Sequence, residues 1–142
     1  MSSGYKKPNL KSLHFDDEVY KIPSLQGKTI AITGTTTGIG FVAARTVAKK
    51  GARTLLLNRK SERSKFSYDQ LKKENPGADF VNIECDLQSF DSVRKAALRV
   101  IDLCQDGLDS LCNNAGIMAL KDEATVDGFD VQMQTNHLSH FL

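Results

Sequence analysis

Short apolar runs recur along the chain, separated by longer segments in which apolar residues return at helical spacing. The short runs have strand length and are bounded by turn-forming residues. We therefore predict β-strands at Thr29–Thr33, Arg53–Asn58, Phe80–Glu84 and Leu108–Cys112. The stretch Leu55–Leu57 lacks polar–apolar alternation, which is expected of a parallel strand covered on both faces.

A helix is predicted after each of the first three strands. The first helix ends at Gly51, and the second covers about Glu62–Asn75 with Ser61 as its N-cap. The third opens at Ser89 or Asp91, and one side of it is expected to pack on the sheet. That side carries Phe90, Val93, Ala97, Val100, Ile101 and Cys104.

A fourth helix is predicted near the end of the chain, capped by Thr125 and carrying Phe129, Met133 and Phe141. The resulting order βαβαβαβα predicts an α/β fold, a doubly wound parallel sheet of the Rossmann type. If the first three strands run outward as 3-2-1 and the fourth starts on the other side of the first, the chain reverses direction between strands one and four. The sheet is expected to be truncated after the fourth strand and its helix. In such a sheet, ligands bind where the strand order reverses, at the carboxyl ends of the strands.

The first 27 residues differ from the rest, because they are polar and mixed in charge. We interpret 1–27 as an N-terminal arm and 28–142 as the N-terminal part of a nucleotide-binding domain. The arm is either a solvated lead-in, which we favour, or a docking segment.

The turn Gly34–Gly40 lies between the first strand and the first helix, where glycines have a specific use. Gly34 lets the chain leave the strand sharply, Gly38 leaves room for a phosphate, and Gly40 allows helix and strand to pack closely. The helix amides around Ile39 and the hydroxyls of Thr35, Thr36 and Thr37 suit a pyrophosphate. A purely structural turn is the alternative.

The end of the second strand selects the cofactor in folds of this kind. A carboxylate there holds the ribose of NAD(H), whereas a basic residue accommodates the 2′-phosphate of NADP(H). This chain has Asn58 and Arg59, followed by Lys60 and Arg63, and no carboxylate before Glu62. We therefore predict a preference for NADP(H) over NAD(H), with Arg59 on the phosphate; the alternative is a solvated basic loop.

Composition excludes several classes of function. The chain has 142 residues, 40% hydrophobic and 25% charged, and its net charge of +2 is too small to indicate nucleic acid binding. Cys85, Cys104 and Cys112 lack metal-site spacing, so we predict no metal and buried thiols in a reducing compartment. No apolar run has membrane-spanning length and no signal-peptide core is present, so a cytoplasmic protein is expected. The alternatives are a peripheral membrane attachment and an anchor outside this sequence.

Four motifs together resemble the short-chain dehydrogenase/reductase family. They are Thr-Gly-x-x-x-Gly-x-Gly at Thr33–Gly40, Asp86 after the third strand, Asn-Asn-Ala-Gly at Asn113–Gly116, and Asn136. The phrases N-N-A-G-I-M and N-H-L-S-H-F are most similar to the retinol-dehydrogenase-like branch, which includes the WW-domain-containing oxidoreductases. The resemblance covers roughly Lys28–Leu142.

The resemblance implies roles for individual residues. Asp86 or Leu87 would meet the adenine, and Asn136 would help hold an active-site water. The backbone of the fourth-strand turn would line the cofactor through Asn113, Asn114, Ala115 and Gly116. Taken singly, Asp86 could be a helix cap, the asparagines turn formers and Asn136 a solvent-facing helix residue.

The resemblance also implies the reaction, a reversible hydride transfer between NADP(H) and a small carbonyl or alcohol, including lipophilic ones. The family's catalytic Ser and Tyr-x-x-x-Lys would follow a fifth strand, and Tyr68 with Lys72 is a chance match on a distant helix. We therefore expect a cofactor-binding half that is inactive alone, and homodimers by resemblance. The alternatives are a non-catalytic NADP(H)-binding or scaffold module and a fragment that binds nothing.

Overall fold

The computed structural model describes residues 12–142 and contains a four-stranded sheet of order β3-β2-β1-β4. All three strand pairings are parallel. The strands are β1 Thr29–Thr33, β2 Arg53–Asn58, β3 Phe80–Glu84 and β4 Ser110–Cys112. The predicted strand order is confirmed, and only β4 begins later than expected.

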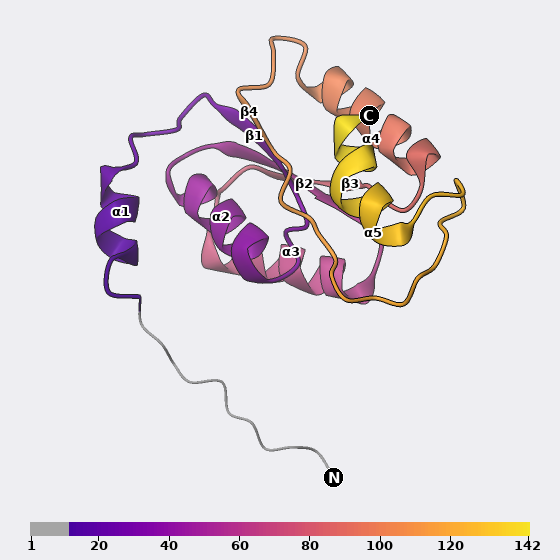
Figure 1. Cartoon of the computed structure of the whole chain (residues 1–142). Helices are drawn as coiled ribbons and strands as arrows, with labels where there is room; N and C mark the ends of the chain where they lie inside the picture. Colours follow the sequence, from indigo (N-terminus) through magenta and orange to yellow (C-terminus); the bar gives the residue numbers. More distant parts are fainter. Residues whose placement is uncertain (1–11) are drawn as a thin grey trace.

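Helices cover both faces of the sheet, as the doubly wound prediction requires. Figure 1 shows α2 and α3 on one face and α4 with α5 on the other. The bounds are α2 Gly38–Lys49, α3 Glu62–Glu74 and α4 Phe90–Leu103. One core cluster includes Leu55 and Ile83 on the α4 side, and the other includes Leu56 and Leu71 on the α2–α3 side. Adjacent residues of β2 thus point to opposite cores, which explains its uninterrupted apolar run.

Two serines cap the helices that follow β2 and β3. Ser61 Oγ accepts a hydrogen bond from Ser64 N at 3.1 Å, which confirms the predicted cap of α3. Ser89 Oγ accepts from Ser92 N at 3.4 Å, so Ser89 and not Asp91 opens α4.

The predicted inner side of α4 was partly wrong. Val93 and Ala96 are the buried residues of this helix, whereas Ala97 is exposed and Ile101 is 66% exposed. The side with Val93 and Ala96 and the side with Ala97 and Ile101 are both apolar, so the sequence of the helix alone does not show which side packs on the sheet.

The final helix begins later than predicted. Thr125 is not its cap: its main-chain N–H donates to the Phe129 carbonyl, closing a short turn before the helix. Asp130 is the cap instead, with its Oδ1 accepting from Met133 N at 2.7 Å. The helix then has three parts, α5 Val131–Met133, a π-helical turn η1 Gln134–Leu138 and α6 Ser139–Phe141. Phe129 precedes the helix and packs on Phe90, with ring centroids 5.5 Å apart.

The polar arm contains a short helix that the sequence reasoning missed, α1 Phe15–Lys21. Acidic residues in its first turn and Lys21 in its last match the helix dipole. None of its residues is buried, so its sequence lacks the apolar stripe from which a helix can be predicted. The remainder of the predicted arm, 1–11, lies outside the described residues. Over residues 12–142, no helix combines the length and apolar character needed to cross a membrane.

Candidate functional site

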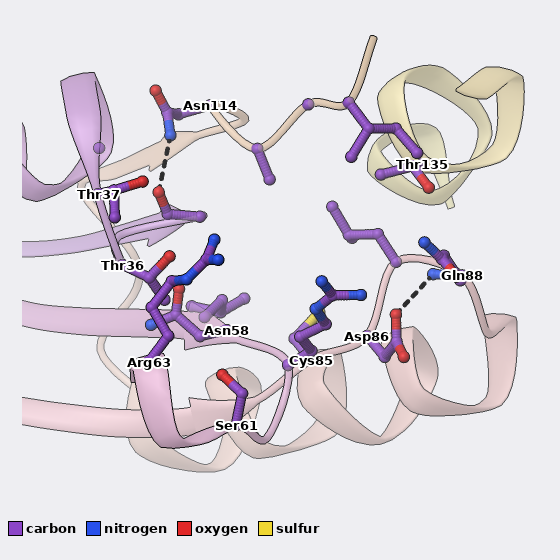
Figure 2. A pocket seen from close by; sticks show the side chains of 18 of the residues that line it. Thr36, Thr37, Asn58, Ser61, Arg63, Cys85, Asp86, Gln88, Asn114 and Thr135 are labelled. Carbon is purple, nitrogen blue, oxygen red and sulfur yellow. Dashed lines mark hydrogen bonds between the residues drawn. The ribbon is translucent and has the colours of Figure 1, made fainter. Parts of the chain in front are cut away.

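A cleft of about 660 Å³ opens at the carboxyl ends of the strands, beside the point where the strand order reverses between β1 and β4. Figure 2 shows side chains from the glycine-rich turn, the turn after β4, the start of α3 and the loop between β3 and α4 around it. Twelve of the residues predicted to bind cofactor line this cleft: Gly34, Thr36, Thr37, Ile39, Gly40, Asn58, Arg59, Asp86, Leu87, Asn114, Ala115 and Gly116.

Four residues predicted to meet the cofactor or its water are not among the lining residues, namely Thr35, Gly38, Asn113 and Asn136. Eight others line the cleft without having been predicted: Leu57, Ser61, Glu62, Arg63, Cys85, Gln88, Ile117 and Thr135. Most of these follow a predicted residue by one to four positions. The signal that could have found them is therefore proximity to a strand end, because strand ends meet at one edge of a parallel sheet.

The glycines of the turn have the geometry that their spacing predicted. Gly34 has φ of +72°, and a Cβ on it would lie 2.8 Å from Ala115. A Cβ on Gly40 would overlap the Gly34 carbonyl and the Asn114 side chain. Gly38 has φ of +61° and no atom within 4 Å of an added Cβ, so its surroundings are open. Close packing and open backbone thus alternate along one turn.

Hydrogen bonds join the glycine-rich turn to the turn after β4. Thr33 Oγ1 accepts from the main-chain N–H groups of Asn114 and Ala115, each at 3.0 Å. The Asn114 side chain donates to the Thr33 and Gly34 carbonyls, at 2.9 and 3.2 Å. The two turns are therefore held together. Within the Asn-Asn-Ala-Gly motif, Asn114 is the residue whose side chain makes these hydrogen bonds.

Asn58, at the end of β2, is engaged with the neighbouring turn. Its Oδ1 accepts from Thr35 N and its Nδ2 donates to Thr35 Oγ1, both at 2.8 Å. Thr35 is fully buried. The expectation that Thr35 offers its hydroxyl to a ligand is therefore wrong, while Thr36 and Thr37 do line the cleft.

The start of α3 brings charge to the cleft. Arg59, Glu62 and Arg63 all line it and are all exposed. In Figure 2 the Arg63 side chain extends from α3 toward Thr36. Neither arginine makes an ion pair within residues 12–142. This end of the cleft thus carries two guanidinium groups and one carboxylate, that of Glu62.

The end of β3 forms the opposite wall. Asp86 Oδ1 accepts from Gln88 N at 3.0 Å, so its carboxylate shapes the loop before α4. Burial, together with the Asp86 charge, raises the pKa of the Cys85 thiol to about 11. Cys85 therefore stays protonated near neutral pH and acts as an apolar wall residue.

Asn136 lies in the π-helical turn and is tied to the loop after β4. Its Oδ1 accepts from Ile117 N and its Nδ2 donates to Ile117 O, both at 2.8 Å. Although it is exposed, its side chain has a fixed orientation. π-helical turns occur often at functional sites.

Tyr68 and Lys72 lie away from the cleft, as the sequence interpretation held. The Tyr68 hydroxyl donates to the Phe80 carbonyl at 3.5 Å, and Lys72 Nζ donates to the Ala78 carbonyl at 3.2 Å. Neither residue lines the cleft. Within residues 12–142 there is also no cluster of His, Cys, Asp and Glu that could hold a metal ion.

Comparison with known proteins shows which family has this sequence and fold. The family described as short chain dehydrogenase matches residues 28–142. An uncharacterized oxidoreductase of Schizosaccharomyces pombe is 40% identical over 85% of this chain and 35% of its own length. Human retinol dehydrogenase 13 is 34% identical over 84% of this chain and 36% of its own. A metagenomic short-chain oxidoreductase, solved in complex with NADP, superposes with a TM-score of 0.69 at 26% identity, over 83% of this chain and 53% of that one. The chain thus spans little more than a third of the curated relatives' length.

Proposed function

The chain belongs to the short-chain dehydrogenase family, and we propose that it is the NADP(H)-binding half of an oxidoreductase. The observation that carries the proposal is one cleft that contains both the glycine-rich turn and two free arginines. NADP(H), when bound, supplies the hydride chemistry. The carbonyl or alcohol on which the whole protein acts, including a lipophilic one, belongs to the same proposal.

The residues of the cleft fit a dinucleotide diphosphate. The backbone around Gly38 is open, and α2 begins there with its unpaired amides and positive dipole end. Thr36 and Thr37 stand beside these amides as further hydrogen-bond donors. Asp86, Leu87 and the turn residues Asn114, Ala115 and Gly116 border the side proposed for the adenosine and the rest of the cofactor.

The preference for NADP(H) follows from the charges at the start of α3. Both polar atoms of the Asn58 side chain bond Thr35, and β2 ends without a carboxylate that could hold the ribose hydroxyls. Arg59 and Arg63 offer planar guanidinium groups that suit a 2′-phosphate. Glu62 is the one carboxylate of this end that would oppose a phosphate.

Catalysis is proposed to need residues beyond this chain. In the family, Ser and Tyr-x-x-x-Lys move the proton, and neither is found at a matching position here. Asn136 would contribute by holding a water of the proton relay. We therefore expect dinucleotide binding without turnover from these 142 residues. Cytoplasmic location and homodimer formation also stay predictions.

The test compares NADPH and NADH titrations, followed by nucleotide fluorescence, for the wild type and Arg59→Asp. We expect Arg59→Asp to weaken NADPH binding by about tenfold or more, because it removes a charge-assisted hydrogen bond and adds repulsion, and to leave NADH binding nearly unchanged. Glu62→Gln is the matched control, expected to strengthen NADPH binding slightly. The NADP(H) assignment would be overturned if Arg59→Asp left the ratio of the NADPH and NADH affinities unchanged. A large loss of NADH binding in Glu62→Gln would overturn it as well.

A further inference from the structure

His140 lies where three segments beside the cleft meet. Its Nε2 is 2.9 Å from Thr33 Oγ1, at the end of β1. Its Nδ1 is 3.3 Å from the main-chain oxygen of Asn136, one turn earlier in the same helix. Because Thr33 Oγ1 also holds two amides of the turn after β4, the imidazole connects the helix of Asn136 to both turns of the cleft.

The hydrogen bonds of Thr33 determine which nitrogen of His140 carries a proton. A hydroxyl has one proton and two lone pairs. The two lone pairs are taken by main-chain N–H groups of the turn after β4, each at 3.0 Å. Thr33 must therefore donate its next hydrogen bond, and His140 Nε2 at 2.9 Å is nearer than the Cys112 carbonyl oxygen at 3.4 Å. It follows that Nε2 is bare, and that Nδ1 carries the proton donated to Asn136 O.

We propose that neutral His140 is a positioning residue for the cleft. By accepting a hydrogen bond from the Thr33 hydroxyl, its Nε2 holds that hydroxyl in the rotamer that binds the turn after β4. By donating from Nδ1, it fixes the main chain at Asn136, whose side chain is already held by Ile117. His140 does not line the cleft, so it acts through Thr33 and Asn136. The role in binding rests on the proposed function, because it concerns the same cofactor cleft.

Three variants of the full chain isolate this role. His140→Leu removes both hydrogen bonds, whereas His140→Gln returns a polar group near the position of Nε2. His137→Leu is the matched control on the same helix. His137 is exposed, its ring stacks on Phe141 with centroids 6.4 Å apart, and it makes no side-chain hydrogen bond within the described part of the chain.

Two readouts compare these variants, the NADPH dissociation constant and hydrogen–deuterium exchange at the Asn114 and Ala115 amides. For His140→Leu we expect NADPH binding to weaken about fivefold and exchange at both amides to rise by a similar factor, the size of one lost hydrogen bond. His140→Gln should recover much of both, and His137→Leu should match the wild type. Equal behaviour of His140→Leu and the wild type, or no rescue by His140→Gln, would overturn the proposal.

A spectroscopic measurement on the wild type tests the same geometry and does not depend on whether a variant folds. ¹⁵N NMR of the histidine rings should show His140 as the neutral tautomer with the proton on Nδ1 and a bare Nε2. A proton on Nε2 at neutral pH would overturn the assignment. If the wild type binds no NADPH, the proposed function fails, while the tautomer and the amide exchange still decide whether His140 positions the two turns.

Discussion

The two ends of the cleft are built from different material. At the glycine-rich turn, backbone packs on backbone: a side chain at Gly40 would overlap its neighbours, and Asn114 bonds across to the Thr33 and Gly34 carbonyls. At the start of α3, Arg59 and Arg63 are exposed side chains without an ion pair in the described residues. One end is defined by shape, the other by charge.

This difference separates affinity from selectivity. Under the proposed function, the turn receives the diphosphate, which NADP(H) and NAD(H) share, so it does not distinguish the two. Only the charged end can respond to a 2′-phosphate. Since exposed side chains contribute little to folding, substitutions there should change selectivity and leave stability almost intact. Substitutions at the turn should instead lower both stability and the affinity for either dinucleotide.

The largest effect is expected from Gly40→Ala, which breaks the shape-defined end. The added Cβ would meet backbone of the first turn, which cannot yield as a flexible side chain would. We expect a loss of unfolding free energy on the order of 3 kcal/mol by chemical denaturation, and loss of NADPH binding. The strand end and the helix start would have to move apart.

Gly77→Ala is the control for this substitution. Gly77 has φ of +86°, so alanine is strained there, but nothing lies within 4 Å of its added Cβ. The cost should be about 1 kcal/mol, with NADPH binding retained. A Gly40→Ala protein as stable as Gly77→Ala would contradict the close-packed description of the turn.

An intermediate effect is expected from Asn58→Ala, which lies between the two ends. The change leaves the buried N–H and hydroxyl of Thr35 without their partner, costing about 1–3 kcal/mol of unfolding free energy. Because both polar atoms of the Asn58 side chain bond Thr35, the ratio of the NADPH and NADH affinities should stay constant. Arg63→Ala is the converse control: we expect its stability to be unchanged and its affinity for NADPH relative to NADH to fall. A changed ratio in Asn58→Ala would show that its side chain contacts the ribose.

Local signals predicted most of the fold and the shape-defined end of the site. The strands were predictable because they are short apolar runs bounded by turn-forming residues, and the parallel sheet followed from the βα alternation. The turn was readable because glycine spacing has a direct steric meaning, as Gly34 and Gly40 confirm. These features depend on residues close together in the sequence.

The features that sequence missed depend on distant contacts. Which stripe of α4 is buried depends on the sheet beneath it, since Ile101 and Leu98 are as apolar as the covered residues but 66% and 67% exposed. Thr125 resembles an N-cap, yet its turn partner is Phe129. His140 meets Thr33 across 107 positions, and no periodicity within a helix can indicate such a pair.

The smallest effect is expected from Tyr68→Phe, which tests whether the Tyr-x-x-x-Lys spacing on α3 belongs to the cleft. The hydroxyl makes one long hydrogen bond, 3.5 Å to the Phe80 carbonyl, and the ring packs on the α2–α3 core. Removing the hydroxyl should change unfolding free energy by no more than about 0.5 kcal/mol and leave NADPH binding unchanged. Tyr68→Ala, which also removes the partly buried ring, should cost about 1–3 kcal/mol while still binding NADPH once folded. A Tyr68→Phe protein that folds normally but loses NADPH binding would extend the site along α3 to Tyr68, and the division into a shape end and a charge end would no longer describe it.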